Sequence, residues 1–127
     1  MTGMRFTVAV HLHGTLAANA QGAFQLPCPA TLLEVSAVAS NDSAATLQLG
    51  TSADADGLMT AKAIGDSSTP VVFTRGRSGN YFDGALVDEN QYPALDDDTI
   101  VTWVLDYDGA GGTAAQHVDI LFTFLEG

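Results

Sequence analysis

Apolar and polar residues alternate with a period of two over a stretch near each end of the chain. In residues 5–13 and 117–125 the even-numbered positions are apolar, from Phe6 to Leu12 and from Val118 to Phe124. Successive side chains of a β-strand point to opposite faces of the sheet, so this period is typical of a strand with one buried face. Both stretches are therefore predicted to be strands that cover a hydrophobic core.

Shorter segments rich in β-branched and apolar residues lie between these two stretches. They predict strands over residues 23–26, 31–40, 45–49, 58–64, 70–74 and 99–107, and a further short strand around 85–87. For residues 58–64 a single helical turn is the alternative. In 31–40 the side chains of Leu33, Val35, Ala37 and Ala39 alternate with those of Leu32, Glu34, Ser36 and Val38. Residues 70–74 begin with proline, which cannot donate a ladder hydrogen bond, so this strand is predicted at a sheet edge.

Turn residues predict two hairpins. Residues 108–112 (DGAGG) separate 99–107 from 117–125, and residues 41–43 (NDS) separate 31–40 from 45–49. Glycine, asparagine and aspartate suit tight reversals of the chain.

About eight short strands without a convincing helix predict an all-β fold. We expect one antiparallel β-sandwich domain over residues 1–127, jelly-roll-like, with the first and last strands side by side in one sheet.

The charge balance excludes one class of partner. The formal net charge is −11, from 15 acidic residues against four Lys and Arg. Binding to nucleic-acid phosphates requires clustered cations, so we expect no nucleic-acid partner.

No apolar run approaches the roughly 20 residues of a membrane helix, and we expect no membrane association. The single cysteine, Cys28, cannot form an intrachain disulfide, which fits assembly in a reducing compartment.

Two histidines present the clearest metal-ligand pattern. His11 and His13 are two positions apart, so on a strand their imidazoles point to the same side, and His117 joins them if the terminal strands pair. The pattern resembles the His-x-His motif of cupins, but alanines 17 and 18 stand where a carboxylate ligand is expected. We interpret the pair as exposed polar residues and predict no metal or other cofactor. A small metal-dependent jelly-roll enzyme is the alternative.

Two acidic pairs resemble the start of a calcium loop. Asp54 and Asp56 precede Gly57, and Asp106 and Asp108 precede a glycine in the same way. Neither stretch has the distal glutamate of an EF-hand-type loop, so we interpret both as turns.

The chain also has no Gly-x-Ser-x-Gly motif and no phosphate-binding loop. We therefore predict that the protein is not an enzyme.

The least regular part of the chain is residues 75–98. A long irregular stretch in a compact domain is usually functional or bound to a partner. The candidate contact residues are cations and aromatics of this stretch: Arg75, Arg77, Tyr81, Phe82 and Tyr92. Together with Trp103 its tyrosines and phenylalanine are also a candidate sugar-stacking platform, although a tryptophan on a strand is more often part of the core.

Residues 50–57 (GTSADADG), 105–109 (LDYDG), 112–115 (GTAA) and 118–127 give the chain a resemblance to a family. They resemble small acidic accessory virion proteins of tailed bacteriophages, among them the head decoration (cement) proteins. The resemblance implies a non-enzymatic virion structural protein that binds the major capsid protein on the outer surface of the head. It also implies a homotrimer located on the capsid surface and assembled in the host cytoplasm. The alternative is a glycan- or receptor-binding module of a tail or baseplate.

Overall fold

A computed structural model describes residues 4–75, 80–87 and 91–127. Within these ranges all regular secondary structure is β, in nine strands. They are β1 (Arg5–Thr15), β2 (Ala20–Gln25), β3 (Ala30–Val38), β4 (Thr46–Thr51), β5 (Asp54–Ala63), β6 (Val71–Phe73), β7 (Ala94–Leu95), β8 (Ile100–Asp106) and β9 (Gln116–Glu126). No helix in the described part of the chain is long and apolar enough to cross a membrane.

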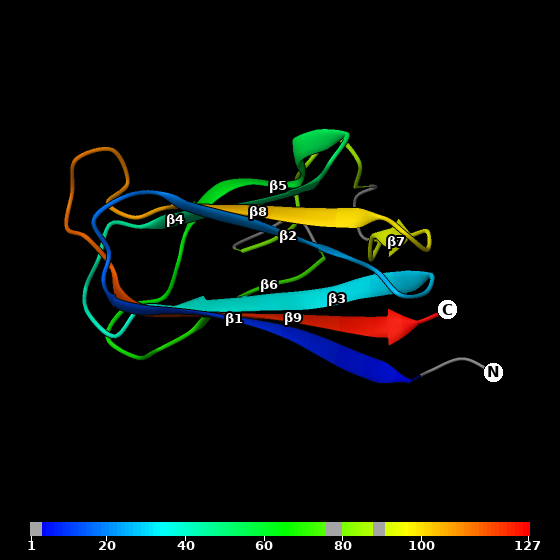
Figure 1. Cartoon of the computed structure of the whole chain (residues 1–127), viewed down its shortest axis with the longest axis horizontal. Coiled ribbons are helices and arrows are strands. Elements are labelled where there is room, and N and C mark those ends of the chain that lie inside the picture. Colours follow the sequence, from blue (N-terminus) through cyan, green and yellow to red (C-terminus); the bar gives the residue numbers. More distant parts are fainter. Residues whose placement is uncertain (1–3, 76–79, 88–90) are drawn as a thin grey trace.

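The strands form two antiparallel sheets that pack face to face (Figure 1). One sheet has the order β1-β9-β3-β6, with the two-residue strand β7 also paired to β3, and the other has the order β2-β8-β4-β5. We call them sheet A and sheet B. Apart from β4 and β5, which pair within sheet B, strands consecutive in the sequence up to β6 lie in opposite sheets. The predicted jelly-roll-like β-sandwich is confirmed.

The first and last strands are neighbours, as the sequence predicts. β1 and β9 pair antiparallel from Arg5↔Leu125 to Leu12↔Val118, and their register then shifts before Thr15↔Gln116. The strand that begins with proline is also where it was expected, because β6 is an edge strand of sheet A.

Both predicted hairpins are wrong. β8 lies in sheet B between β2 and β4, whereas β9 lies in sheet A between β1 and β3. β3 and β4 are likewise in different sheets. Each of these four strands carries a nearly continuous apolar face, and stacking two such faces across a sandwich buries both of them. The turn residues therefore carry the chain from one sheet to the other.

The alternation of buried and exposed side chains is interrupted near the start of β3. Leu32 is fully buried and Leu33 is only partly buried, whereas Val35 and Ala37 face the core. The pairing of β3 with β9 shifts register between Leu32 and Glu34. This β-bulge inserts one residue and reverses the inward-outward alternation before it.

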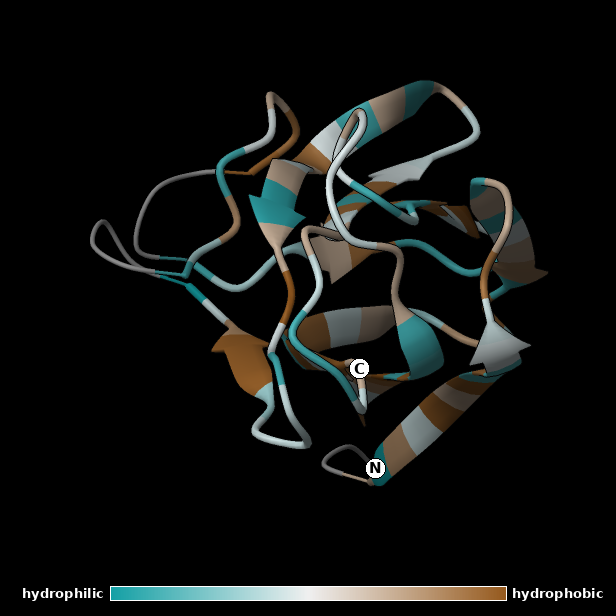
Figure 2. Ribbon diagram, turned by 90° about the vertical axis from the view of Figure 1, so that its left-hand side faces the viewer, coloured by the Kyte–Doolittle hydropathy of each residue, from teal (hydrophilic) through white to brown (hydrophobic). Residues whose placement is uncertain are grey.

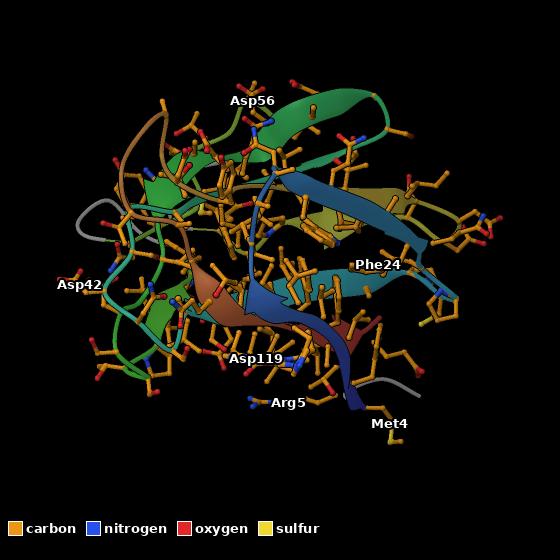
Figure 3. The ribbon with its side chains drawn as sticks, turned by 60° about the vertical axis from the view of Figure 1, so that its left-hand side comes forward. Met4, Arg5, Phe24, Asp42, Asp56 and Asp119 are labelled. Atoms are coloured by element: carbon orange, nitrogen blue, oxygen red, sulfur yellow. The ribbon has the colours of Figure 1, made fainter. Side chains whose placement is uncertain are left out.

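Aromatic side chains join the two sheets at the centre of the core. Phe24 of sheet B lies edge-on to Phe122 of sheet A, with ring centroids 5.0 Å apart, and Figure 3 shows it between the layers. Phe124 stacks on Phe6 of the edge strand at 5.1 Å. Trp103 is also in the core, with 6% of its surface exposed. Hydrophobic and hydrophilic bands alternate along the strands in Figure 2, as expected for strands with one buried face.

Candidate functional site

The segment 80–87 lies along the outer edge of β5. The amide of Gly84 donates to the carbonyl oxygen of Leu58 at 3.1 Å, and that of Leu86 donates to Gly57 at 2.8 Å. The amide of Val87 bonds back to Gly84 at 3.1 Å, which closes a turn. The strand predicted around residues 85–87 is therefore wrong, because this turn bends the chain away after two contacts with β5.

Asp83 ties this segment to β5 through its carboxylate. It accepts hydrogen bonds from the amide and the hydroxyl of Thr60, both at 2.8 Å, and from Lys62 Nζ at 3.0 Å. Partial burial acts to raise the pKa of Asp83, but the hydrogen bonds from Thr60 and Lys62 together outweigh it and hold the pKa below 3.8. Asp83 is therefore ionised at neutral pH and covers an edge amide that would otherwise face solvent.

The predicted contact residues of segment 75–98 do not share one environment. The guanidinium of Arg75 lies 4.6 Å from the centre of the Tyr92 ring, and Lys62 Nζ lies 5.0 Å from that of Tyr81. These are cation–π pairs on the surface. Phe82 is only 2% exposed, so it belongs to the core and we remove it from the contact set. Arg77 lies outside the described residues.

Segment 75–98 contributes to an exposed apolar patch that was not predicted from the sequence. Leu86 and Ile100 are 51% and 39% exposed, and both line a shallow hollow of ≈ 440 Å³ together with Leu95, Asp96 and Asp98. A signal for Ile100 was present, because it is an apolar residue on the polar face of its strand, opposite Val101. Leu86 lies two residues after Gly84 in an acidic loop, where no periodic pattern distinguishes it. We call Leu86, Leu95 and Ile100 the Leu86 patch.

The two acidic pairs behave differently in the structure. Asp106 accepts hydrogen bonds from the amides of Asp108 and Gly109, at 3.4 and 3.1 Å, which is the predicted turn chemistry. Asp54 and Asp56 instead lie at the start of strand β5. A hydrogen bond and the charge of Asp54 raise the pKa of Asp56 above 3.8. Among the described residues neither pair belongs to a cluster of three potential metal ligands.

The three histidines come together on the outer face of sheet A. Because β1 and β9 pair, His117 joins His11 and His13, and one ring nitrogen of each lies within 4.8 Å of the others. The rings of His13 and His117 are 4.9 Å apart, and those of His11 and His13 are 6.0 Å apart. All three side chains are exposed, as was expected of His11 and His13.

Two further contacts orient this cluster. The Nδ1 atom of His11 is hydrogen-bonded to a carboxylate oxygen of Asp119, and the amide of Gly14 donates to His117 Nδ1 at 3.1 Å. Gly14 and His117 have φ angles of 80° and 47°, at the point where the β1–β9 register shifts. Figure 3 shows Asp119 on the outer side of sheet A and Asp56 on the outer side of sheet B.

Comparison with known proteins finds likeness in structure and none in sequence. Neither a protein-family model nor a curated protein matches this sequence. A chain described as "Cyanophage Pam1 capsid asymmetric unit" has a similar fold, with a TM-score of 0.57 and 16% identity. The similarity covers 99% of the present chain and 87% of that one. At this identity the likeness concerns the fold alone.

Proposed function

We propose that the protein is a non-enzymatic structural component of a bacteriophage virion that decorates the outer surface of the head and stabilises it. The observation that carries this proposal is the similarity, over nearly the whole chain, to the fold of a chain from a cyanophage capsid asymmetric unit. Fold alone does not define function, so the proposal also depends on the surface.

The charge of the molecule supports a position outside the capsid. A net charge of −11 repels packaged DNA and keeps a surface protein soluble at high local concentration. A decoration protein also requires a rigid, well-packed fold. The core has this property, because its large aromatic and aliphatic side chains are almost completely buried.

The surface around segment 75–98 is the proposed contact with the major capsid protein. The Leu86 patch exposes apolar side chains beside a hollow, and the Arg75–Tyr92 pair adds an exposed aromatic ring with a cation over it. Aromatic residues, arginine and apolar side chains are the residue types enriched in protein interfaces.

The open edge of β1 is the proposed site of self-association into a homotrimer. Among the described residues β1 pairs with β9 only, so the backbone groups along its other edge are available. Its inward-facing side chains from Phe6 to Leu12 are only partly buried, whereas those of β9 from Val118 to Phe124 are completely buried. Unpaired edges of this length are usually covered by a partner or blocked.

A glycan- or receptor-binding module of a tail or baseplate remains the second candidate. A groove of ≈ 450 Å³ on sheet B supports it, since polar side chains of Gln21, Thr51, Ser52 and Thr102 line this groove. Trp103, which also lines it, is almost completely buried and offers little ring surface for sugar stacking. This candidate is therefore weaker than the decoration role.

Two measurements test the proposed function. Light scattering gives the mass of the purified protein in solution, and sedimentation measures its binding to expanded, undecorated heads of the virus that encodes it. We expect a trimer that saturates the heads at a number fixed by the capsid lattice. A monomer that does not bind heads would overturn the decoration role, and binding to a glycan array would then support the second candidate.

A further inference from the structure

We propose that His11, His13 and His117 bind one divalent transition-metal ion, for which Zn²⁺ is the representative, on the outer face of sheet A. The site is formed by the last residues of β1 and the first residues of β9. These strand ends lie at the end of the sandwich opposite the two termini (Figure 1). The inference is independent of the proposed role on a phage head.

The spacing of the three imidazoles suits a single ion. Their ligand nitrogens all lie within 4.8 Å of one another. In a tetrahedral site with Zn–N bonds of about 2.0–2.1 Å, the ligand nitrogens are roughly 3.4 Å apart. Rotation of exposed side chains covers this difference without a change in the backbone. Three protein ligands leave a fourth position open to water or to a group of another molecule.

The contact between Asp119 and His11 prepares His11 as a ligand. The carboxylate accepts the proton of Nδ1, so the neutral ring has its lone pair on Nε2. A carboxylate that holds the distal nitrogen of a histidine in this way is the usual second ligand shell of protein zinc sites. Asp119 faces His11 directly across the β1–β9 pair, so its position is fixed by the register.

His117 must change its hydrogen bonding when the ion binds. Its Nδ1 accepts the amide proton of Gly14, so the neutral ring carries its own proton on Nε2. Coordination through Nδ1 displaces the Gly14 amide. Coordination through Nε2 requires the ring proton to move to Nδ1, which then can no longer accept from Gly14. In both cases the hydrogen bond at the bulge is altered. The amide of Gly14 is therefore a specific reporter of metal binding.

The ligand type selects the class of ion. Imidazole suits zinc, copper, nickel and cobalt ions, whereas calcium and magnesium prefer oxygen ligands. A bound ion links β1, an edge strand, to β9, a central strand, and binding to the folded state alone raises stability by mass action. We expect ZnCl₂ to raise the melting temperature and CaCl₂ and MgCl₂ at the same concentration to leave it unchanged.

The composition of the chain makes the test direct. All three histidines of the sequence belong to the cluster, so an NMR spectrum of the imidazole side chains reports on the site alone. ZnCl₂ is titrated into the full chain, freed of metal, and followed by calorimetry and by NMR. We expect one ion per chain, with shifts of all three imidazoles and of the Gly14 amide.

Variants identify the ligands. We expect His13→Ala to abolish saturable binding and Asp119→Asn to weaken it about tenfold, the usual effect of removing such a carboxylate. His117→Asn tests the third ligand, because asparagine tolerates the positive φ of this position. Cys28→Ser is the matched control and should bind zinc as the wild type does, since Cys28 is not part of the cluster.

Two results would overturn the proposal. One is the absence of saturable zinc binding by the wild type. The other is binding that His13→Ala leaves unchanged or that shifts fewer than three imidazoles. The spectrum of the wild type decides the question even if a variant fails to fold.

Discussion

Gly84 lies directly on Gly57, so closely that a Cβ atom on Gly84 would stand 2.1 Å from the Gly57 carbonyl carbon. The neighbouring atoms are backbone and cannot rotate away. We therefore expect Gly84→Ala to separate segment 80–87 from β5 and to lower the free energy of unfolding by about 1–3 kcal/mol, the usual cost of overpacking. Urea unfolding measures this change. The adjacent exposed residue provides the control: Ala85→Ser should change stability by less than about 0.5 kcal/mol.

Asp83 should contribute stability in a pH-dependent way. Its pKa is lowered in the folded state, so its contribution is complete above the unfolded value of about 3.9 and is lost as the pH falls through the lower folded value. Hydrogen bonds to a charged group are worth about 1.5–3 kcal/mol, and we expect Asp83→Asn to cost this much at pH 7. The difference from wild type should shrink below about pH 4. Urea unfolding at pH 7 and below about pH 4 measures this difference. The control is Asp42→Asn, a substitution at an exposed residue. An equal loss at both pH values would contradict the role of the charge.

The alternation in β9 predicts a large loss of stability for one truncation and a small loss for its neighbour. Phe122 is completely buried against Phe24, so Phe122→Ala should lower the free energy of unfolding by about 3–5 kcal/mol. Leu121 points to the outer face, and Leu121→Ala should cost no more than about 0.5 kcal/mol. Thermal unfolding followed by circular dichroism compares the two. Similar losses for both variants would show that the register of β9 is different.

Gly22 makes room for the only tryptophan. A Cβ on Gly22 would lie 2.6 Å from the indole ring of Trp103, which is paired with it across β2 and β8. We expect Gly22→Ala to displace the ring toward solvent and shift its fluorescence to longer wavelength, with a loss of about 1–3 kcal/mol. Since the chain has one tryptophan, the emission reports on this position only. Ala23→Ser, next to it and exposed, should leave the spectrum unchanged.

The Leu86 patch should matter for the capsid and not for the fold. Leu86→Ser removes an exposed apolar side chain, so we expect unfolding within about 0.5 kcal/mol of wild type. Binding to undecorated heads should weaken at least tenfold, as for a central interface residue. Leu121→Ser removes an exposed leucine from the outer face of sheet A and should bind heads normally. Equal binding by the two variants would place the capsid contact elsewhere.

The strands and their buried faces could be predicted from the sequence better than the connections between strands. Period-two patterns such as those of β1 and β9 indicate which face of a strand is buried. The pairing of these two strands was predicted correctly. Turn residues such as Asp108 and Gly109 indicate only that the chain changes direction. Whether the next strand pairs with the previous one or crosses to the other sheet depends on all the apolar faces together, so both hairpins were wrong.

For the candidate sites, the sequence found residue types and missed their environment. Phe82 and Tyr81 are adjacent and similar, yet one enters the core and the other lies at the surface beside Lys62. The chain is extended here and pairs with Thr74, so the two side chains point to opposite sides, and the sequence does not show which side faces the core. The histidine cluster was foreseeable in part, because His11 and His13 share a face and only the pairing of β1 with β9 was needed to add His117.

The pairing of β1 with β9 also sets the order of events during synthesis. Their partners Leu12 and Val118 are separated by nearly the whole chain. At the usual rate of about 5–20 residues per second, β1 waits on the order of 5–20 s for its partner to be translated. Sheet A therefore closes only after the ribosome has delivered β9, and until then the apolar face of β1 is a target for chaperones.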